Sequence, residues 1–338
     1  MIMNMELARK KVLVTGASGF IGGAVMKRLL ASGHEVHGYV RKSSDRSYLS
    51  QTSPEVTLHV GGINDQRALS LAMQDMQWVI HCAGVNSFWE RRRRRYHQVN
   101  TRGTRHVMLI AHEAAVQKVV NVSTVMAYGF PQQQPFIEDS EVGQHTSNYA
   151  HSKFMGDREA SIRHKKQGLP LVTVYLAAVL GAGDQKDVMK VSRFLEGRVP
   201  VMINSPHRFT YIHINDAAEA IVRAAEKQDN IGERYLVGKF SMTTQEYFEI
   251  ISELSGVSVP NKTIGRLPAF VLASLLTTWS NIIKRPPLMP LDLIRTVYEG
   301  DLIFDDSKAE KELGLTYTPI RQALTDVISN LQNKSLDE

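Results

Sequence analysis

The chain has 338 residues, of which 43% are hydrophobic and 22% charged, and its formal net charge is +6. This composition is typical of a soluble globular protein, and the length suits one large α/β domain or a core domain with a smaller lobe. A single cysteine, Cys82, excludes an intramolecular disulfide and fits a reducing compartment. The first residues lack the basic and apolar segments of a secretory signal, so a cytoplasmic protein is expected.

Short apolar runs alternate with longer amphipathic segments through the first half of the chain. Strands are expected at residues 12–14, 35–40, 56–60, 78–81, 118–122 and 171–175, and helices at 21–32, 65–76, 101–115 and 149–166. This alternation predicts βαβ units with right-handed crossovers. The expected fold is therefore α/β, a doubly wound parallel sheet of the Rossmann type.

The alternation breaks near residue 181. Residues 1–180 are predicted to form the dinucleotide-binding domain, and residues 181–338 mainly a smaller C-terminal substrate lobe. A strand at 208–216 followed by a helix at 217–227 places residues 206–238 back at the sheet, and further helices are expected at 245–254 and 308–313.

An apolar stretch at residues 267–283 is followed by Lys284 and Arg285. Because polar residues interrupt its second half, it falls short of a convincing transmembrane helix. A buried or pocket-lining helix is the favoured interpretation. The alternative is a peripheral membrane contact from Leu267 to Arg285, with the two basic residues at the lipid headgroups.

Five successive arginines, Arg91, Arg92, Arg93, Arg94 and Arg95, form a second unusual segment. Such a run is typical of a solvated face. A site for anionic groups (phosphate, coenzyme A or lipid headgroups) is the main alternative. Nucleic acid is not expected as a partner, because no nucleic-acid-reading motif accompanies the run.

A glycine-rich turn follows the first predicted strand and opens the first predicted helix. Gly16 would permit a tight turn, Gly19 a close approach of the backbone to a pyrophosphate, and Gly22 close helix–strand packing. The pyrophosphate would lie at the helix N-terminus, where free N–H groups favour anions. The turn also places Ser18, Phe20 and Ile21 at the cofactor.

The second predicted strand ends in Arg41 and Lys42. NAD sites usually carry an acidic residue there, on the ribose 2′-hydroxyl. Two cations would instead meet a 2′-phosphate, so the sequence predicts NADP(H) rather than NAD(H). The alternative is a pair of solvated basic residues.

Tyr149 and Lys153 stand four residues apart in a predicted helix, so their side chains share one face. A neighbouring ammonium favours the phenolate, which predicts a lowered pKa for Tyr149. The phenol could then donate or accept a proton near neutral pH. Cys82 is expected to be a small buried side chain, and no histidine has the spacing of a metal ligand, so no metal is expected.

These residues resemble the extended short-chain dehydrogenase/reductase family, the NAD(P)-dependent epimerase/dehydratase superfamily. The resemblance extends over most of the chain and is closest to the dihydroflavonol-reductase and 3β-hydroxysteroid-dehydrogenase-like branch. Its motifs are Thr15-Gly16-Ala17-Ser18-Gly19-Phe20-Ile21-Gly22, Val79-Ile80-His81-Cys82-Ala83-Gly84, Val99-Asn100-Thr101-Arg102-Gly103-Thr104, Val122-Ser123-Thr124-Val125-Met126-Ala127-Tyr128-Gly129, Tyr149-Ala150-His151-Ser152-Lys153, Leu180-Gly181-Ala182-Gly183-Asp184 and Asp305-Asp306-Ser307-Lys308-Ala309.

The resemblance implies a catalytic role for three residues. Tyr149 would exchange a proton with the substrate oxygen, Lys153 would hold the nicotinamide ribose, and Thr124 would bind the same oxygen, with Ser123 as the alternate. It also implies a homodimer. Further cofactor contacts are expected from Ile63, Cys82, Ala83, Gly84, Ala178 and Val179, whereas Gly62 replaces the acidic residue that often holds adenine.

The leading interpretation is an NADPH-dependent oxidoreductase acting on an apolar carbonyl or alcohol. A nucleotide-sugar epimerase or dehydratase is the alternative, although such dehydratases carry an Asp-Glu pair where Val125 and Met126 follow Thr124. A non-catalytic NADP(H)-sensing protein is the third possibility, and it would be favoured by loss of Tyr149 or Lys153.

Overall fold

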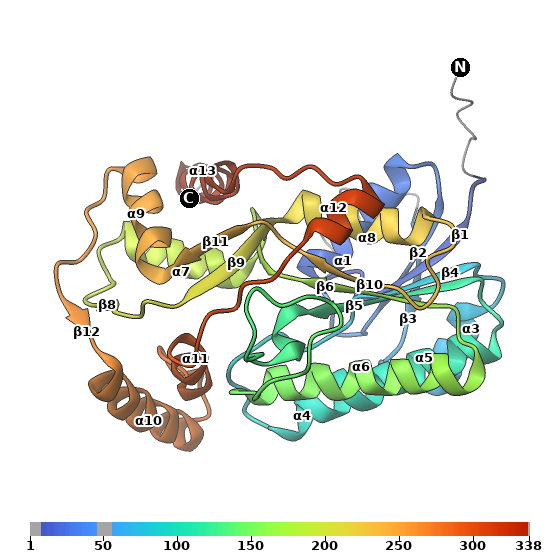
Figure 1. The fold of residues 1–338 in the computed structure, drawn as a ribbon, viewed down its shortest axis with the longest axis horizontal. Coiled ribbons are helices and arrows are strands. Elements are labelled where there is room, and N and C mark those ends of the chain that lie inside the picture. Colours follow the sequence, from blue (N-terminus) through green and yellow to red (C-terminus); the bar gives the residue numbers. More distant parts are fainter. Residues whose placement is uncertain (1–7, 46–55, 337–338) are drawn as a thin grey trace.

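A computed structural model describes residues 8–45 and 56–336, and the side chains of 185–187 and 333–336 are not considered. Within these ranges seven parallel strands form the main sheet, in the order β10-β6-β5-β4-β1-β2-β3 (Figure 1). Their bounds are β1 Lys11–Thr15, β2 Glu35–Val40, β3 Thr57–Val60, β4 Trp78–His81, β5 Lys118–Thr124, β6 Leu171–Leu176 and β10 Arg234–Val237. This order is that of a doubly wound sheet and confirms the predicted Rossmann fold.

Helices cover both faces of the main sheet (Figure 1). One face carries α1 (Phe20–Ala31), α8 (Ile214–Glu226) and α12 (Ser307–Leu313), and the other carries α3 (Gln66–Met73), α5 (Thr104–Glu113) and α6 (Asn148–Gln167). Strand β1 shows why both faces of the main sheet are buried. Val12 and Val14 belong to the core beneath α1 and α8, whereas Leu13 points into the core beneath α3 and α5.

The chain between β4 and α5 departs from the predicted helix at 101–115. A short α4 (Arg94–Tyr96) continues into a π-helical segment, His97–Gly103, and only then into α5. Gly156 of α6 packs closely against this segment, since a Cβ there would lie 2.2 Å from the Asn100 carbonyl oxygen. A π-helical turn is often found at functional sites. After β5 a 3₁₀ turn, Val125–Tyr128, leads towards α6.

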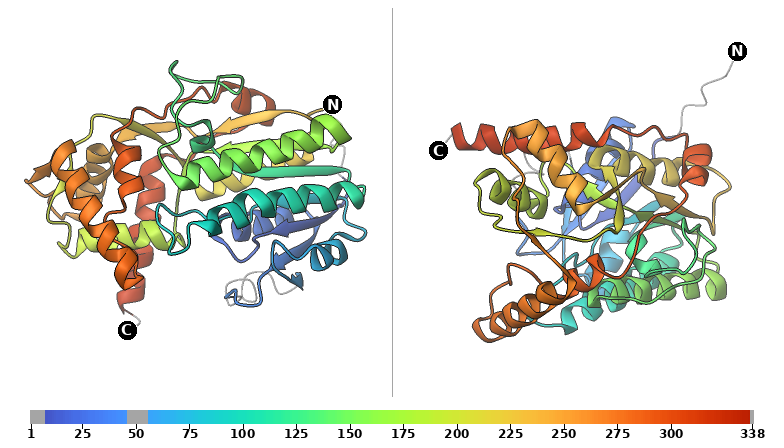
Figure 2. Two further views of the ribbon diagram at one scale, coloured as in Figure 1. Left: turned by 90° about the horizontal axis from the view of Figure 1, so that it is seen from below. Right: turned by 60° about the vertical axis from the view of Figure 1, so that its left-hand side comes forward.

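The smaller lobe is built mostly from residues beyond 177. Its central sheet has the order β11-β9-β7, and β12 pairs with β8. The bounds are β7 Ala178–Leu180, α7 Gln185–Leu195, β8 Met202–Ile203, β9 Arg208–His213, β11 Phe240–Thr243, α9 Thr244–Ser255, β12 Thr263–Ile264, α10 Arg266–Ile283, α11 Leu291–Val297 and α13 Ile320–Leu336. Figure 2 shows α10 and α11 together at one end of the molecule.

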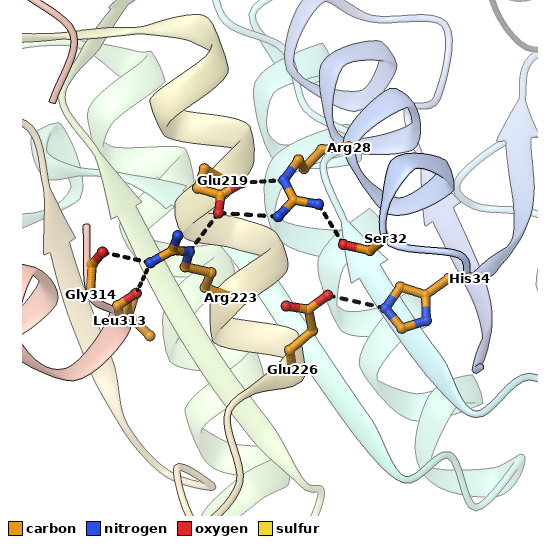
Figure 3. Close-up of polar contacts among 8 residues, drawn as sticks. All are labelled: Arg28, Ser32, His34, Glu219, Arg223, Glu226, Leu313 and Gly314. Atoms are coloured by element: carbon orange, nitrogen blue, oxygen red, sulfur yellow. Dashed lines mark hydrogen bonds and ion pairs between the residues drawn. The ribbon is translucent and has the colours of Figure 1, made fainter. Parts of the chain in front are cut away.

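Charged side chains fasten α8 onto the first βα unit (Figure 3). Glu219 of α8 accepts hydrogen bonds from Arg28 of α1 and from Arg223 one turn further along α8. His34, at the start of β2, lies 3.2 Å from Glu226. The hydrogen bond with Arg28 is the main reason why the pKa of Glu219 lies below its ordinary value. A segment from the second half of the chain thus completes the cofactor-binding half.

Helix α10 differs from the favoured interpretation of the stretch at 267–283. Only Ala269, Ala273 and Ser280 of this helix are buried, so it is not a core helix. Leu267 is 80% exposed and Leu275 is 65% exposed. The small residues explain the difference, because they let one side of the helix pack closely while the large side chains face outward. No helix in the described ranges combines the length and the hydropathy needed to cross a membrane.

Candidate active site

The carboxyl ends of the parallel strands bring the predicted cofactor residues to one edge of the sheet. The Cys82 N–H, just after β4, donates to the Thr15 carbonyl oxygen at 3.1 Å, and the Gly16 N–H donates to the Tyr39 carbonyl oxygen at 3.2 Å. The ends of β1, β2 and β4 therefore meet around the glycine turn. This is the edge at which open α/β sheets bind ligands.

The glycine turn has the backbone that a dinucleotide site requires. Gly16 has φ +73°, and a Cβ there would lie 2.8 Å from the backbone of Ala83. At Gly22 a Cβ would lie 2.2 Å from the Gly16 carbonyl oxygen, so the helix packs tightly against the turn. Gly19 is the N-cap of α1, and no side chain caps the helix. The N-terminus of α1 therefore presents N–H groups to an anion, which fits a pyrophosphate.

The other predicted cofactor residues surround this turn. Arg41 and Lys42 are exposed directly after β2, and the chain turns there through reciprocal hydrogen bonds between Arg41 and Ser44. Ile63 is half-buried after β3, against the π-helical segment. The remaining residues fall on three elements: Ser18, Phe20 and Ile21 on the turn and α1, Ala83 and Gly84 after β4, and Ala178 and Val179 on β7.

Helix α6 presents Tyr149 and Lys153 on one buried face. Ser147 is its N-cap and accepts a hydrogen bond from the Ala150 N–H. The ammonium of Lys153 donates to the Val122 carbonyl oxygen at 2.9 Å, which ties α6 to β5. The phenol of Tyr149 lies against the edge of the Phe88 ring, with centroids 6.4 Å apart. These contacts fix both side chains beside the end of β5.

The predicted lowering of the Tyr149 pKa is wrong for this structure. Burial raises the pKa of Tyr149 to about 12, and the hydrogen bond with Thr124 opposes that rise only partly. Burial also lowers the pKa of Lys153, while the negative charge of Asp157 raises it. The cost of burying a phenolate, to which the negative charge of Asp157 adds, therefore sets the direction of the pKa shift, and Tyr149 carries its proton at neutral pH.

The two candidate hydroxyls at the end of β5 have different partners. Ser123 donates to Asp157 Oδ2 at 2.6 Å, away from Tyr149. Thr124 shares a side-chain hydrogen bond with Tyr149 and also accepts one from the Met126 N–H at 3.3 Å. The structure thus pairs Thr124, and not Ser123, with the phenol.

Asp157 was not expected at the site. It follows Lys153 by four residues on α6, the same spacing that joins Tyr149 to Lys153. Asn121 donates to Asp157 Oδ1 at 2.9 Å, and burial raises the pKa of the carboxyl. The spacing alone could have indicated this residue, whereas its burial beside β5 depends on the tertiary fold.

Asn100 lies in the π-helical segment and clamps the loop after β4 onto α6. Its Oδ1 accepts from the Val85 N–H at 2.7 Å, and its Nδ2 donates to the Val85 carbonyl oxygen and to Ser152 Oγ. These contacts hold the loop that carries Phe88 and Trp89. Asn100 is thus a positioning residue for the site.

Two further expectations concern Cys82 and metal ions. Cys82 is half-buried, and burial raises the pKa of its thiol to about 12. A thiol of that pKa is a poor nucleophile, although the side chain is half-buried and not fully buried as expected. Among the residues that the structure describes, no group of three or more His, Cys, Asp or Glu side chains could hold a metal ion.

Comparison with known proteins agrees with the fold and the glycine turn. The sequence profile of the NAD dependent epimerase/dehydratase family matches residues 12–238, about two thirds of the chain. The chain belongs to this family. Its members are NAD(P)-dependent epimerases, dehydratases and oxidoreductases, which confirms the resemblance to extended short-chain dehydrogenases and reductases.

The names of individual relatives refer to several different activities. The chain is 29% identical to a protein provisionally named dihydroflavonol 4-reductase from Synechocystis sp., with 95% of this chain and 94% of that protein covered. It is 27% identical to sterol demethylase protein B of Methylococcus capsulatus, with 96% and 99% covered. It is also 28% identical to a UDP-glucose 4-epimerase of Neisseria meningitidis serogroup C, with 74% and 84% covered.

Solved structures have the same fold. The crystal structure of gox2253 superimposes with a TM-score of 0.82 at 26% identity and covers 96% of this chain and 99% of that one. DesIV, a dTDP-glucose 4,6-dehydratase from Streptomyces venezuelae solved with NAD bound, gives a TM-score of 0.77 at 21% identity, with 96% and 98% covered. This second likeness shows the shared fold alone.

Proposed function

We propose that this protein is an NADP(H)-dependent oxidoreductase that interconverts a carbonyl and a secondary alcohol on an apolar small molecule. The hydrogen-bonded pair of hydroxyls, Thr124 and Tyr149, carries the proposal. It provides two adjacent groups that can bind one substrate oxygen. The Phe88 ring against Tyr149 supplies an apolar wall next to that position.

The roles of the side chains follow from their protonation. A nicotinamide cofactor bound at the glycine turn would supply or accept the hydride. In the reduction direction, Tyr149 holds a proton at neutral pH and donates it to the oxygen that gains negative charge. Thr124 donates a hydrogen bond to the same oxygen and orients it. In the oxidation direction Tyr149 must first lose its proton to solvent, and the phenolate, stabilised by the nearby Lys153 ammonium, then accepts the hydroxyl proton.

The preference for NADP(H) rests on Arg41 and Lys42. Both are exposed just beyond β2, where the adenosine ribose of a dinucleotide lies in this fold. Both residues are basic, so they would attract a 2′-phosphate, whereas an acidic residue would repel it. Dissociation constants for NADPH and NADH test this directly. Tighter binding of NADH would refute the preference.

The proposed chemistry is tested with Tyr149→Phe. NADPH consumption is followed against a panel of apolar ketones and aldehydes. The variant is expected to lose turnover and to retain NADPH binding, because only the proton donor is removed. Tyr235→Phe is the matched control, since it removes a buried hydroxyl on β10 that contacts Glu312. Normal turnover by Tyr149→Phe would refute the mechanism.

A second candidate function is nucleotide-sugar epimerisation. The 28% identity with a UDP-glucose 4-epimerase favours it. In that case the protein would convert a UDP-hexose to its 4-epimer without net consumption of NADPH. Incubation with UDP-glucose and analysis of the sugars by chromatography separates the two functions.

A further inference from the structure

Helix α10 carries a row of large apolar side chains that no other part of the described chain covers. The row, termed the α10 stripe, consists of Leu267, Val271, Leu275, Trp279 and Ile282. These residues are spaced three or four apart, so they lie along one side of the helix. All five are exposed, with Trp279 at 59%. A contiguous apolar patch of this kind marks a surface that binds a membrane or another molecule.

The other side of α10 provides its attachment to the protein. Ala269 and Ala273 are fully buried in a cluster with Ile294 and Tyr298, which come from α11 and the residue that follows it. The helix is thus anchored through small residues at short range. The large side chains of the α10 stripe contribute little to the core, so their exposure needs another explanation.

The charges on α10 and in the residues just after it are all of one sign. Residues 266–288 contain Arg266, Lys284 and Arg285 and no acidic residue. The indole N–H of Trp89 donates to Asn281 Oδ1 at 3.1 Å, so the loop before the arginine run contacts the C-terminal part of α10. The five arginines at 91–95 are all exposed. Figures 1 and 2 show α10 and α4 on the same side of the molecule.

We propose that α10 docks flat on an anionic lipid surface, with the α10 stripe in the acyl-chain boundary and the basic residues at the headgroups. An exposed apolar face flanked by Lys and Arg is the pattern of an interfacial helix. A second copy of this chain fits the same face poorly. Symmetric pairing through α10 would bring two clusters of like charge together, whereas anionic headgroups neutralise them.

Docking in this way places the candidate active site near the lipid. Trp89 contacts α10, and the preceding residue, Phe88, packs against Tyr149. The loop therefore links the docking helix to the catalytic phenol. An apolar substrate could then enter from the membrane without crossing water, a consequence that rests on the proposed function.

Co-sedimentation with vesicles tests the docking without substrate or cofactor. Wild-type protein is expected to bind vesicles of an equal mixture of phosphatidylcholine and phosphatidylglycerol, and to bind pure phosphatidylcholine at least about tenfold more weakly. Raised salt should weaken the binding. Failure to bind the anionic vesicles, or equal binding to both kinds, would overturn the proposal.

Two matched pairs of variants locate the contact. Leu275→Glu is expected to reduce vesicle binding roughly tenfold or more, because it places a charge in the apolar contact. Leu71→Glu, at a position 57% exposed on α3 at the far end of the sheet, is its control. Arg93→Glu should likewise weaken binding, with Arg67→Glu on α3 as its control. Equal losses in a variant and its control would overturn the assignment of the surface.

The fluorescence of Trp279 reports how deeply its side chain enters the lipid bilayer. Its fluorescence should shift to the blue on addition of anionic vesicles and should be quenched by lipids brominated on the acyl chains. Loss of both signals in Trp279→Phe would assign them to α10. If sedimentation analysis instead shows a wild-type dimer that Leu275→Glu dissociates, with no vesicle binding, the face is an interface between copies and the proposal is wrong.

The test also separates docking from catalysis. Tyr149→Phe is expected to bind vesicles as the wild type does, since Tyr149 is buried away from the α10 stripe. Vesicle binding without any turnover would leave the docking intact and refute the proposed function. Turnover without vesicle binding would support the proposed function and refute the docking.

Discussion

The hydroxyl of Ser123 donates to the carboxylate of Asp157 across 2.6 Å. This hydrogen bond decides the geometry at the end of β5, because it turns Ser123 away from Tyr149. The neighbouring Thr124 points to the opposite side of the extended chain and hydrogen-bonds the phenol. Ser123 thus helps to hold α6 against the sheet, whereas the hydroxyl of Thr124 is available to bind the substrate.

Removal of the Thr124 hydroxyl and removal of the Ser123 hydroxyl are therefore expected to have different effects on activity. Thr124→Val should lower kcat by about 10² to 10³, the usual effect of removing one donor from a developing oxyanion. Ser123→Ala should lower kcat far less and reduce thermal stability, since it leaves Asp157 without one donor. Steady-state kinetics on both variants compares them. The assignment of Thr124 fails if Ser123→Ala has the larger effect on kcat.

The proton on Tyr149 can be observed directly. Because burial raises the pKa of Tyr149 to about 12, its resonance in tyrosine labelled with ¹³C at Cζ should not titrate between neutral pH and pH 10. Thr124→Val should raise the pKa further, since the Thr124 hydrogen bond lowers it. The spectrum of Tyr149→Phe assigns the signal. Titration between pH 7 and 9 would show that the Lys153 ammonium outweighs burial after all.

Asp157 is expected to act as a positioning residue through Lys153. Its charge raises the pKa of Lys153 against the lowering effect of burial. Asp157→Asn should lower the Lys153 pKa further, so the loss of NADPH affinity at alkaline pH should begin at a lower pH. Ser123→Ala is the control, because it breaks a hydrogen bond to Asp157 and keeps the charge. A purely structural role predicts identical pH profiles for the two variants.

The basic residues after β2 give a prediction on cofactor choice. Arg41→Ala and Lys42→Ala should each weaken NADPH binding by roughly tenfold and leave NADH binding nearly unchanged, because only NADPH carries the 2′-phosphate. Calorimetric titration with both nucleotides measures this. Lys27→Ala removes an exposed cation from α1 and controls for net charge. Equal weakening of both nucleotides would show that these residues do not read the 2′-phosphate.

The ionic contacts between α1 and α8 should contribute to stability in a pH-dependent way. Glu219→Gln is expected to lower the free energy of unfolding by about 1 to 2 kcal/mol at neutral pH. Because the pKa of Glu219 is lowered below its ordinary 4.5, its contribution is present above that pH and is lost as the pH falls through the lowered value. The wild type and the variant should therefore converge in acid.

Chemical denaturation at several pH values provides the measurement for this contact. Glu141→Gln is the control, since Glu141 is exposed at the surface. A difference between the wild type and Glu219→Gln that stays constant down to strongly acidic pH would contradict the ionic role of Glu219.

Local patterns in the sequence were sufficient for the fold and the cofactor turn. The apolar runs identify the parallel strands, and the glycine spacing identifies a turn whose backbone excludes a Cβ at Gly16 and Gly22. Tyr149 and Lys153 share a face because helix periodicity is a local property. Such features depend on neighbours in the chain, so they can be predicted from the sequence.

Features that depend on tertiary contacts could not be predicted in the same way. The apolar pattern of 267–283 does not reveal that Ala269 and Ala273 are the only apolar side chains of α10 that are fully buried. Likewise, the pKa of Tyr149 depends on burial around α6. The direction of the Lys153 side chain towards the Val122 carbonyl oxygen is set by the packing of α6 on β5.

The return of α8 and β10 to the main sheet has a consequence for biosynthesis. The strand at one edge of that sheet ends at Val237, and α8 covers the face next to α1. A ribosome must therefore synthesise about 240 residues before the nucleotide-binding half has all its strands. Until α8 has been synthesised, the apolar faces of β5 and β6 that it covers are open to solvent. A chaperone that shields this surface would act during the long interval between the synthesis of β6 and that of α8.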